Sequence, residues 1–203
     1  MQADQAQSRT GAYPGRPTQL AIIGVIGSDS HPGEEISAHA LHVADDIGRR
    51  LAMRGALLVT GGSGGIMEAV SKGAYDAGGV VIGFLPGRTR EGANRYVTIP
   101  LCTGLGEIRS HLTISASDVI IMIAGSTGTL NEATIAYGHK PLVVVTGTGG
   151  WSDRLGQTLY GGMHFDERST ATVHFTATAA EAVELAFALA MPKEPPKDEG
   201  TTS

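Results

Sequence analysis

The sequence has little of what marks secreted, membrane-bound or zinc-binding proteins. Cys102 is the only cysteine in 203 residues, which excludes an intrachain disulfide and any zinc site built from several thiolates. No apolar run approaches the roughly 20 residues of a membrane span, and residues 1–8 lack the basic and apolar regions of a signal peptide. We therefore expect a protein of a reducing cytoplasm that does not bind membranes.

Positive charge is also scarce. Fifteen Lys and Arg residues against 20 Asp and Glu residues give a formal charge of -5, which argues against the basic surface that nucleic acid requires. The seven histidines do not have metal-site spacing, since His39 and His42 share a helix face without a third ligand and no H-E-x-x-H motif occurs. We expect neither a nucleic-acid partner nor a metal held by protein ligands.

Length and patterning predict one α/β domain. With 41% hydrophobic residues, the chain suffices for a single core over residues 18–191, flanked by polar, flexible tails at residues 1–17 and 192–203. Apolar runs alternate with helical patterns, which is typical of a Rossmann-like domain with a mostly parallel central sheet and helices on both faces. The runs lie at residues 20–26, 56–59, 80–85, 119–124, 142–145 and 172–175.

Glycine is abundant, at 29 residues, and concentrates where predicted strands end. Four glycine-bearing loops follow strands, at residues 27–30, 61–65, 125–128 and 147–150. Parallel strands bring such loops to one rim of the sheet, where small ligands bind. The free N–H groups of a following helix favour an anion there, so we expect a phosphorylated small molecule at this rim.

Familiar phosphate and cofactor motifs are missing. The first predicted strand is not followed by G-x-G-x-x-G, and G-x-x-x-x-G-K-[ST] does not occur, which disfavours dinucleotide binding and P-loop ATPase activity. Pyridoxal phosphate chemistry needs a lysine at the site. Lys72 lies within a predicted helix and Lys140 precedes a strand away from the rim, so a decarboxylase is not expected.

Two charged residues allow either a functional or a purely structural interpretation. Glu132 lies one turn inside the helix that follows the loop at residues 125–128, where its carboxylate could contact a ligand or assist glycosidic cleavage. The segment from Thr129 to Glu132 also reads as a capping box, in which both side chains satisfy backbone N–H groups. Arg109 could bind a phosphate bidentately, or could be a solvated arginine or part of an intrahelical pair.

Several motifs together resemble the superfamily that includes the LOG proteins, often mislabelled lysine decarboxylases, and the molybdenum cofactor carrier proteins. The LOG signature is P-G-G-x-G-T-x-x-E, and residues 124–132 read A-G-S-T-G-T-L-N-E. Residues 61–74 are similar to a G-G-x-x-G-x-M-x-A block shared by both groups. Residues 77–86, 94–99 and 147–153 are similar to segments of the carrier branch.

The resemblance implies a carrier-like protein that binds a phosphorylated, nucleotide-like molecule, with molybdenum cofactor, pterin or nucleotide as the bound group and no other cofactor required. The alternative is a LOG-type phosphoribohydrolase, in which Arg109 and Glu132 would release a free base and ribose 5-phosphate from a nucleoside 5′-monophosphate. LOG enzymes usually follow that arginine with lysine, whereas Ser110 follows here. Related proteins form dimers or larger assemblies, so a homo-oligomer, dimeric or tetrameric, is expected.

The ligand-binding residues predicted from the loops and the resemblance lie in four segments. They are Gly27, Ser28, Gly61, Gly62, Ser63, Gly64, Gly65, Met67, Arg109, Gly125, Ser126, Thr127, Gly128, Thr129 and Glu132.

Overall fold

The computed structural model describes residues 20–30 and 35–190. The predicted tails, residues 1–17 and 192–203, lie outside the described residues. Within those residues, no helix has the length and apolar character needed to cross a membrane.

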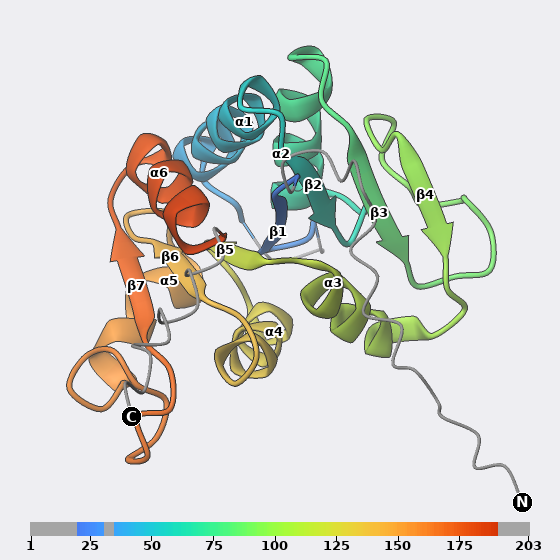
Figure 1. Cartoon of the computed structure of the whole chain (residues 1–203). Helices are drawn as coiled ribbons and strands as arrows, with labels where there is room; N and C mark the ends of the chain where they lie inside the picture. Colours follow the sequence, from blue (N-terminus) through green and yellow to red (C-terminus); the bar gives the residue numbers. More distant parts are fainter. Residues whose placement is uncertain (1–19, 31–34, 191–203) are drawn as a thin grey trace, which may run out of the picture.

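The centre of the molecule is one seven-stranded sheet in which all paired strands run parallel, in the order β4-β3-β2-β1-β5-β6-β7 (Figure 1). This confirms the predicted Rossmann-like fold. The strands are β1 Ile22–Gly27, β2 Leu57–Thr60, β3 Val81–Leu85, β4 Ile99–Cys102, β5 Val119–Ile123, β6 Leu142–Val145 and β7 Val173–Thr176.

Helices cover both faces of the sheet (Figure 1). One face carries α1 Ala38–Met53, α2 Gly65–Asp76 and α6 Ala179–Ala190, and the other carries α3 Ser110–Ala116, α4 Thr127–Tyr137 and α5 Gly150–Thr158. A short 3-10 helix, η1 Gly106–Arg109, leads directly into α3. Helices on both faces explain why the strands read as continuous apolar runs instead of alternating ones.

The central strand β5 shows how the two faces are filled. Ile121 and Ile123 belong to the core beneath α1, α2 and α6, whereas Ile120 and Met122 belong to the core beneath α3, α4 and α5. Successive side chains of a strand point to opposite faces, so a buried strand must be apolar at every position.

The sequence pattern missed β4, which pairs with β3 at one edge of the sheet. Its Ile99 and Leu101 are exposed, and Pro100 cannot donate a ladder hydrogen bond. Edge strands tolerate both features because one side of the strand has no partner. A short strand with proline and no buried face carries no periodic signal.

The order of the strands creates a switch point beside β1. The chain fills the sheet outward from β1 through β2, β3 and β4, then returns to place β5 on the opposite side of β1. Gly27 and Ile123, the last residues of these neighbouring strands, lie in register. Loops leave this point in opposite directions, which opens a crevice at the carboxyl ends of the strands.

Candidate functional site

A cavity of about 570 Å³ lies at this switch point. Its walls come from the loops after β1, β2, β3 and β5, from η1 and the start of α3, and from the first turns of α2 and α4. The lining residues are Gly27, Asp29, Ser63, Met67, Pro86, Glu107, Arg109, Ser110, Ser126, Thr127, Gly128, Thr129, Asn131 and Glu132.

The N-terminus of α4 opens into the cavity without a side-chain cap. The helix begins at Thr127, and its N-cap residue Ser126 makes no side-chain capping hydrogen bond. Because the first N–H groups of a helix have no acceptor within it, those of Thr127, Gly128 and Thr129 are available to a ligand. The positive end of the helix dipole adds to their preference for an anion.

The capping box predicted for Thr129 and Glu132 is wrong. Since α4 begins at Thr127, Thr129 is its third residue and cannot be the N-cap. A capping box exists instead at α6, where the N–H of Glu181 donates to the hydroxyl of Thr178 and the N–H of Thr178 donates to the carboxylate of Glu181. The structure therefore contradicts the interpretation of Glu132 as part of a capping box.

The N-terminus of α2 differs, because the protein supplies its own anion there. The N–H of Gly64, the N-cap residue, donates to the carboxylate of Asp29 at 3.0 Å, and the N–H of Ile66 donates to the carbonyl of Ser28. The carboxylate of Asp29 also accepts the N–H of Ser30 at 2.7 Å. Of the glycine loops at residues 61–65 and 125–128, the one before α4 thus has the freer N–H donors.

Among the described residues, Arg109 is the only basic one that lines the cavity, and it is buried, with 8% of the residue exposed. Its Nε finds no hydrogen-bond partner among the described residues. Leaving a buried guanidinium donor unpaired is costly, and an anion in the cavity would satisfy it. The solvated-arginine alternative is contradicted by this burial.

Glu132 faces the cavity from the second turn of α4. Burial raises the pKa of its carboxyl group above the ordinary 4.5, and the nearby Glu107 adds to this, while the charge of Arg109 and a hydrogen bond from Ser110 pull the pKa down. A carboxyl group with a raised pKa in a cavity that an arginine and a serine also line is placed for ligand contact or proton transfer.

The structure divides the predicted site residues into two groups. Those that line the cavity are Gly27, Ser63, Met67, Arg109, Ser126, Thr127, Gly128, Thr129 and Glu132. Those that do not are Ser28, Gly61, Gly62, Gly64, Gly65 and Gly125. Members of the second group lie behind the wall, where Gly61 makes room for Arg109 and the hydroxyl of Ser28 accepts the N–H of Gly125 at 3.1 Å.

The predicted set lacks five of the lining residues, Asp29, Pro86, Glu107, Ser110 and Asn131. Glu107 and Ser110 flank Arg109 in the chain, and one turn of η1 brings them to the same wall. Their proximity to a candidate arginine was the signal available. Pro86 and Asn131 carry no such signal.

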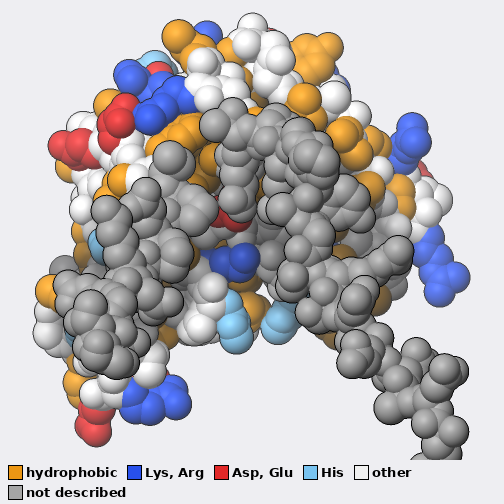
Figure 2. Space-filling model, in the orientation of Figure 1, with side chains coloured by type: hydrophobic (Ala, Val, Ile, Leu, Met, Phe, Trp, Pro, Cys, Tyr) orange, Lys and Arg blue, Asp and Glu red, His pale blue; other side chains and the backbone are white. Residues whose placement is uncertain are grey.

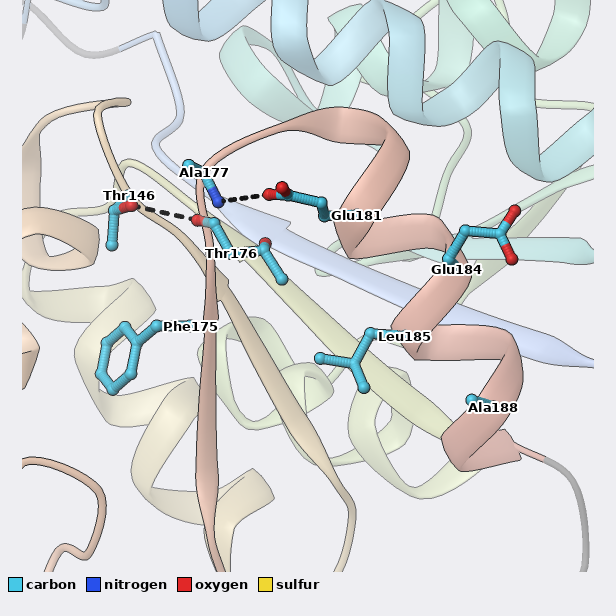
Figure 3. A pocket seen from close by; sticks show the side chains of 8 residues that line it. All are labelled: Thr146, Phe175, Thr176, Ala177, Glu181, Glu184, Leu185 and Ala188. Carbon is cyan, nitrogen blue, oxygen red and sulfur yellow. Dashed lines mark hydrogen bonds between the residues drawn. The ribbon is translucent and has the colours of Figure 1, made fainter.

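A second hollow lies between β7 and α6 and is mainly apolar, as Figure 3 shows for Phe175, Leu185 and Ala188. Its carboxylate Glu181 is occupied by the N–H of Ala177 at 3.0 Å, and the hydroxyl of Thr146 donates to the carbonyl of Thr176. Most of its polar groups are thus paired within the protein, although the buried hydroxyl of Thr176 has no hydrogen-bond partner among the described residues. The cavity at the switch point is the better candidate site.

Charged side chains on one face of the molecule are dispersed. On the face seen in Figure 2, Lys and Arg side chains lie in separate groups among acidic and apolar ones. Residues 20–30 and 35–190 contain no group of three His, Cys, Asp or Glu residues that could hold a metal ion.

Comparison with known proteins identifies the family. Residues 20–183 match the model of the SLOG cluster4 family, so the chain belongs to that family. The solved structure of TM1055 is 34% identical, with a TM-score of 0.78 over 83% of this chain and 99% of that chain. This confirms the resemblance seen in the motifs.

Two further solved structures carry names that describe a ligand. The molybdenum cofactor binding protein from the phototrophic bacterium Rippkaea orientalis is 30% identical, with a TM-score of 0.71 over 86% of this chain and 100% of that chain. The molybdenum cofactor carrier protein from Chlamydomonas reinhardtii is 32% identical, with a TM-score of 0.70 over 84% and 98%. This chain is similar to both over nearly their whole length.

Proposed function

We propose that the protein binds a phosphorylated, nucleotide-like small molecule in the cavity at the switch point and acts as a carrier of that molecule. The observation that carries the proposal is that the uncapped N-terminus of α4 and the buried, unpaired Nε of Arg109 belong to one cavity. Both groups favour an anion, and together they define a site for one phosphate. The similarity to molybdenum cofactor carrier proteins supports the same ligand class.

The remaining charges define the rest of the ligand. Asp29, Glu107 and Glu132 also line the cavity, so carboxylates outnumber the single arginine. Carboxylates accept hydrogen bonds and repel further negative charge, which disfavours a polyphosphate. A ligand with one phosphate at α4 and hydroxyl or N–H donors toward the carboxylates suits this arrangement. A nucleotide or a pterin phosphate, including the organic part of molybdenum cofactor, has that polarity.

The cavity also has suitable size. Ligand pockets for small molecules and cofactors span about 300 to 1,000 Å³, and about 570 Å³ lies inside this range. Molybdenum cofactor would bring its own metal and redox chemistry, while the residues named here would only hold its phosphate and donor groups.

Binding is tested by calorimetry with adenosine 5′-monophosphate and inorganic phosphate as probes. We expect the nucleotide to bind, and Arg109→Lys to weaken binding about tenfold or more, because lysine cannot pair bidentately with a phosphate. The matched control is Arg90→Lys, since Arg90 is exposed in the loop after β3 and does not line the cavity. Equal effects of the two substitutions would contradict the proposal.

A phosphoribohydrolase is the second candidate, favoured by the presence of Glu132 and Arg109 in one cavity and by the raised pKa of the Glu132 carboxyl group. A carboxyl group with raised pKa suits proton transfer during glycosidic cleavage. Incubation with a panel of nucleoside monophosphates and measurement of free base separates the two functions. Base release that Glu132→Gln abolishes would establish hydrolysis, whereas binding without release across the panel favours the carrier.

A further inference from the structure

The loop after β6, residues 147–150, packs against the back of the turn that precedes α4. It is one of the four glycine loops that the sequence placed at the ligand-binding rim of the sheet. Residues 147–150 do not line the cavity. The carboxylate of Asp153 accepts the N–H groups of Gly147, at 2.5 Å, and Gly149, at 3.0 Å, which closes this loop on itself. The hydroxyl of Thr148, in the same loop, accepts the N–H of Ala124.

Ala124 adopts a conformation that an L-residue rarely takes. Its φ is 53°, in the left-handed region, where a β-carbon crowds the following carbonyl and costs about 1 to 2 kcal/mol. Such a conformation persists only when the surrounding structure determines it, and it gathers at sites where geometry matters. Ala124 is the residue at which β5 turns toward the uncapped end of α4.

Every backbone polar group of Ala124 and Gly125 is hydrogen-bonded to another segment, either a neighbouring loop or the first turn of α5. The N–H of Ala124 donates to the hydroxyl of Thr148 at 2.9 Å, and the hydroxyl of Thr148 donates in turn to the carbonyl of Val145 at 2.7 Å. The carbonyl of Ala124 accepts both the hydroxyl of Ser152, at 2.8 Å, and its N–H, at 3.0 Å.

Gly125 is fixed in the same way from two sides. Its N–H donates to the hydroxyl of Ser28, and its carbonyl accepts the N–H of Trp151 at 2.9 Å. Gly150 passes so close that a β-carbon there would collide with the carbonyl oxygen of Gly125. Thr148 and Ser152 are themselves buried, at 2% and 1% exposure. Water therefore cannot replace these bonds at low cost.

We infer that Thr148 and Ser152 are positioning residues, which hold Ala124 in its left-handed conformation, fix the turn that continues through Gly125, and so direct the free N–H groups of residues 127–129 into the cavity. The inference rests on the proposed function for its ligand, but the rigidity of the turn can be measured without one. Neither residue touches the cavity, so each acts only through the backbone that it holds.

The test compares Thr148→Val, which keeps the shape of the side chain but loses the hydroxyl, with Thr148→Ser, which keeps the hydroxyl. The matched control is Thr146→Val. Thr146 follows the same strand, and its hydroxyl bonds to the carbonyl of Thr176, away from the turn. Two quantities are measured: amide hydrogen exchange at Gly125 in the free protein, and affinity for adenosine 5′-monophosphate.

We expect Thr148→Val to accelerate exchange at Gly125 and to weaken nucleotide binding, each by about tenfold, which is the scale of one buried hydrogen bond. Thr148→Ser should restore both to within about twofold, and Thr146→Val should change neither beyond its effect on global stability. Gly125 is informative because its N–H bonds to Ser28, so its exchange changes only if the whole turn loosens.

Exchange at Gly125 that is equal in Thr148→Val and Thr146→Val would overturn the inference, as would unchanged nucleotide affinity beside faster exchange. If the unmodified protein binds neither nucleotide nor phosphate, the proposed function fails. Faster exchange at Gly125 in Thr148→Val alone would then still support the role of Thr148 in holding the turn.

Discussion

The guanidinium of Arg109 lies directly over the α-carbon of Gly61. A β-carbon at position 61 would lie 2.6 Å from Cζ of Arg109 and 2.7 Å from Nη2, so the guanidinium would have to move away from its present place. Gly61 follows β2, and Arg109 ends η1 about 50 residues later in the chain. The glycine is thus explained by the arginine that it accommodates, since Gly61 itself does not line the cavity.

We expect Gly61→Ala to displace the guanidinium and to weaken nucleotide binding about tenfold or more, because the phosphate would lose a bidentate donor. Calorimetry with adenosine 5′-monophosphate measures the effect. Gly138→Ala is the control, since a β-carbon at Gly138 would meet nothing within 4 Å. Binding by Gly61→Ala equal to that of the control would show that Arg109 does not hold the ligand.

The raised pKa of the Glu132 carboxyl group predicts how the stability of the protein depends on pH. Because the folded protein raises the pKa of this carboxyl group above 4.5, it binds the proton more tightly than the unfolded chain does. The carboxyl group therefore favours folding most below pH 4.5, and this contribution is lost as pH rises through the raised pKa. We expect Glu132→Gln to have a higher melting temperature than the unmodified protein at pH 7, with a smaller difference at pH 4.

The lowered pKa of the Glu181 carboxyl group predicts the opposite dependence of stability on pH. The N–H groups of Ala177 and Thr178 and the hydroxyl of Thr178 lower the pKa of its carboxyl group below the ordinary 4.5. Its contribution to folding is present above that value and is lost as pH falls through the lowered pKa. We expect Glu181→Gln to lower the melting temperature at pH 7 and to have less effect at pH 3. Parallel pH profiles for the two variants would contradict both assignments.

The side chain of Asn94 stabilises the glycine loop at residues 61–65, so its removal should lower the stability of the fold. Its Nδ2 donates to the carbonyls of Gly62, at 3.2 Å, and Ser63, at 2.8 Å, and its Oδ1 accepts the N–H of Tyr96. Loss of these bonds in Asn94→Ala should cost about 1 to 3 kcal/mol in unfolding free energy, measured with urea. The exposed Gln157→Ala serves as control and should change stability by less than about 0.5 kcal/mol.

Much of the fold follows from the sequence alone. Continuous apolar runs such as residues 119–123 can be buried only between two helical layers, and glycines after those runs mark the carboxyl rim of a parallel sheet. These are local patterns, and the order of strands and helices follows from them. The edge strand β4 was not predicted from the sequence, because its Pro100 and exposed Ile99 do not follow the pattern of a buried strand.

The site itself was decided by tertiary structure. The sequence shows four similar glycine loops, but it does not show that Asp29 occupies the donor at α2 or that Thr148 and Ser152 hold the turn before α4. These bonds join residues 24 to 35 positions apart, and they determine which N–H groups stay free. The start of α4 at Thr127, and with it the failure of the capping box at Glu132, is likewise seen only in the structure. Local propensity places a helix near this loop, whereas contacts from neighbouring loops and from α5 fix the turn before it and leave the N–H donors of α4 for a ligand.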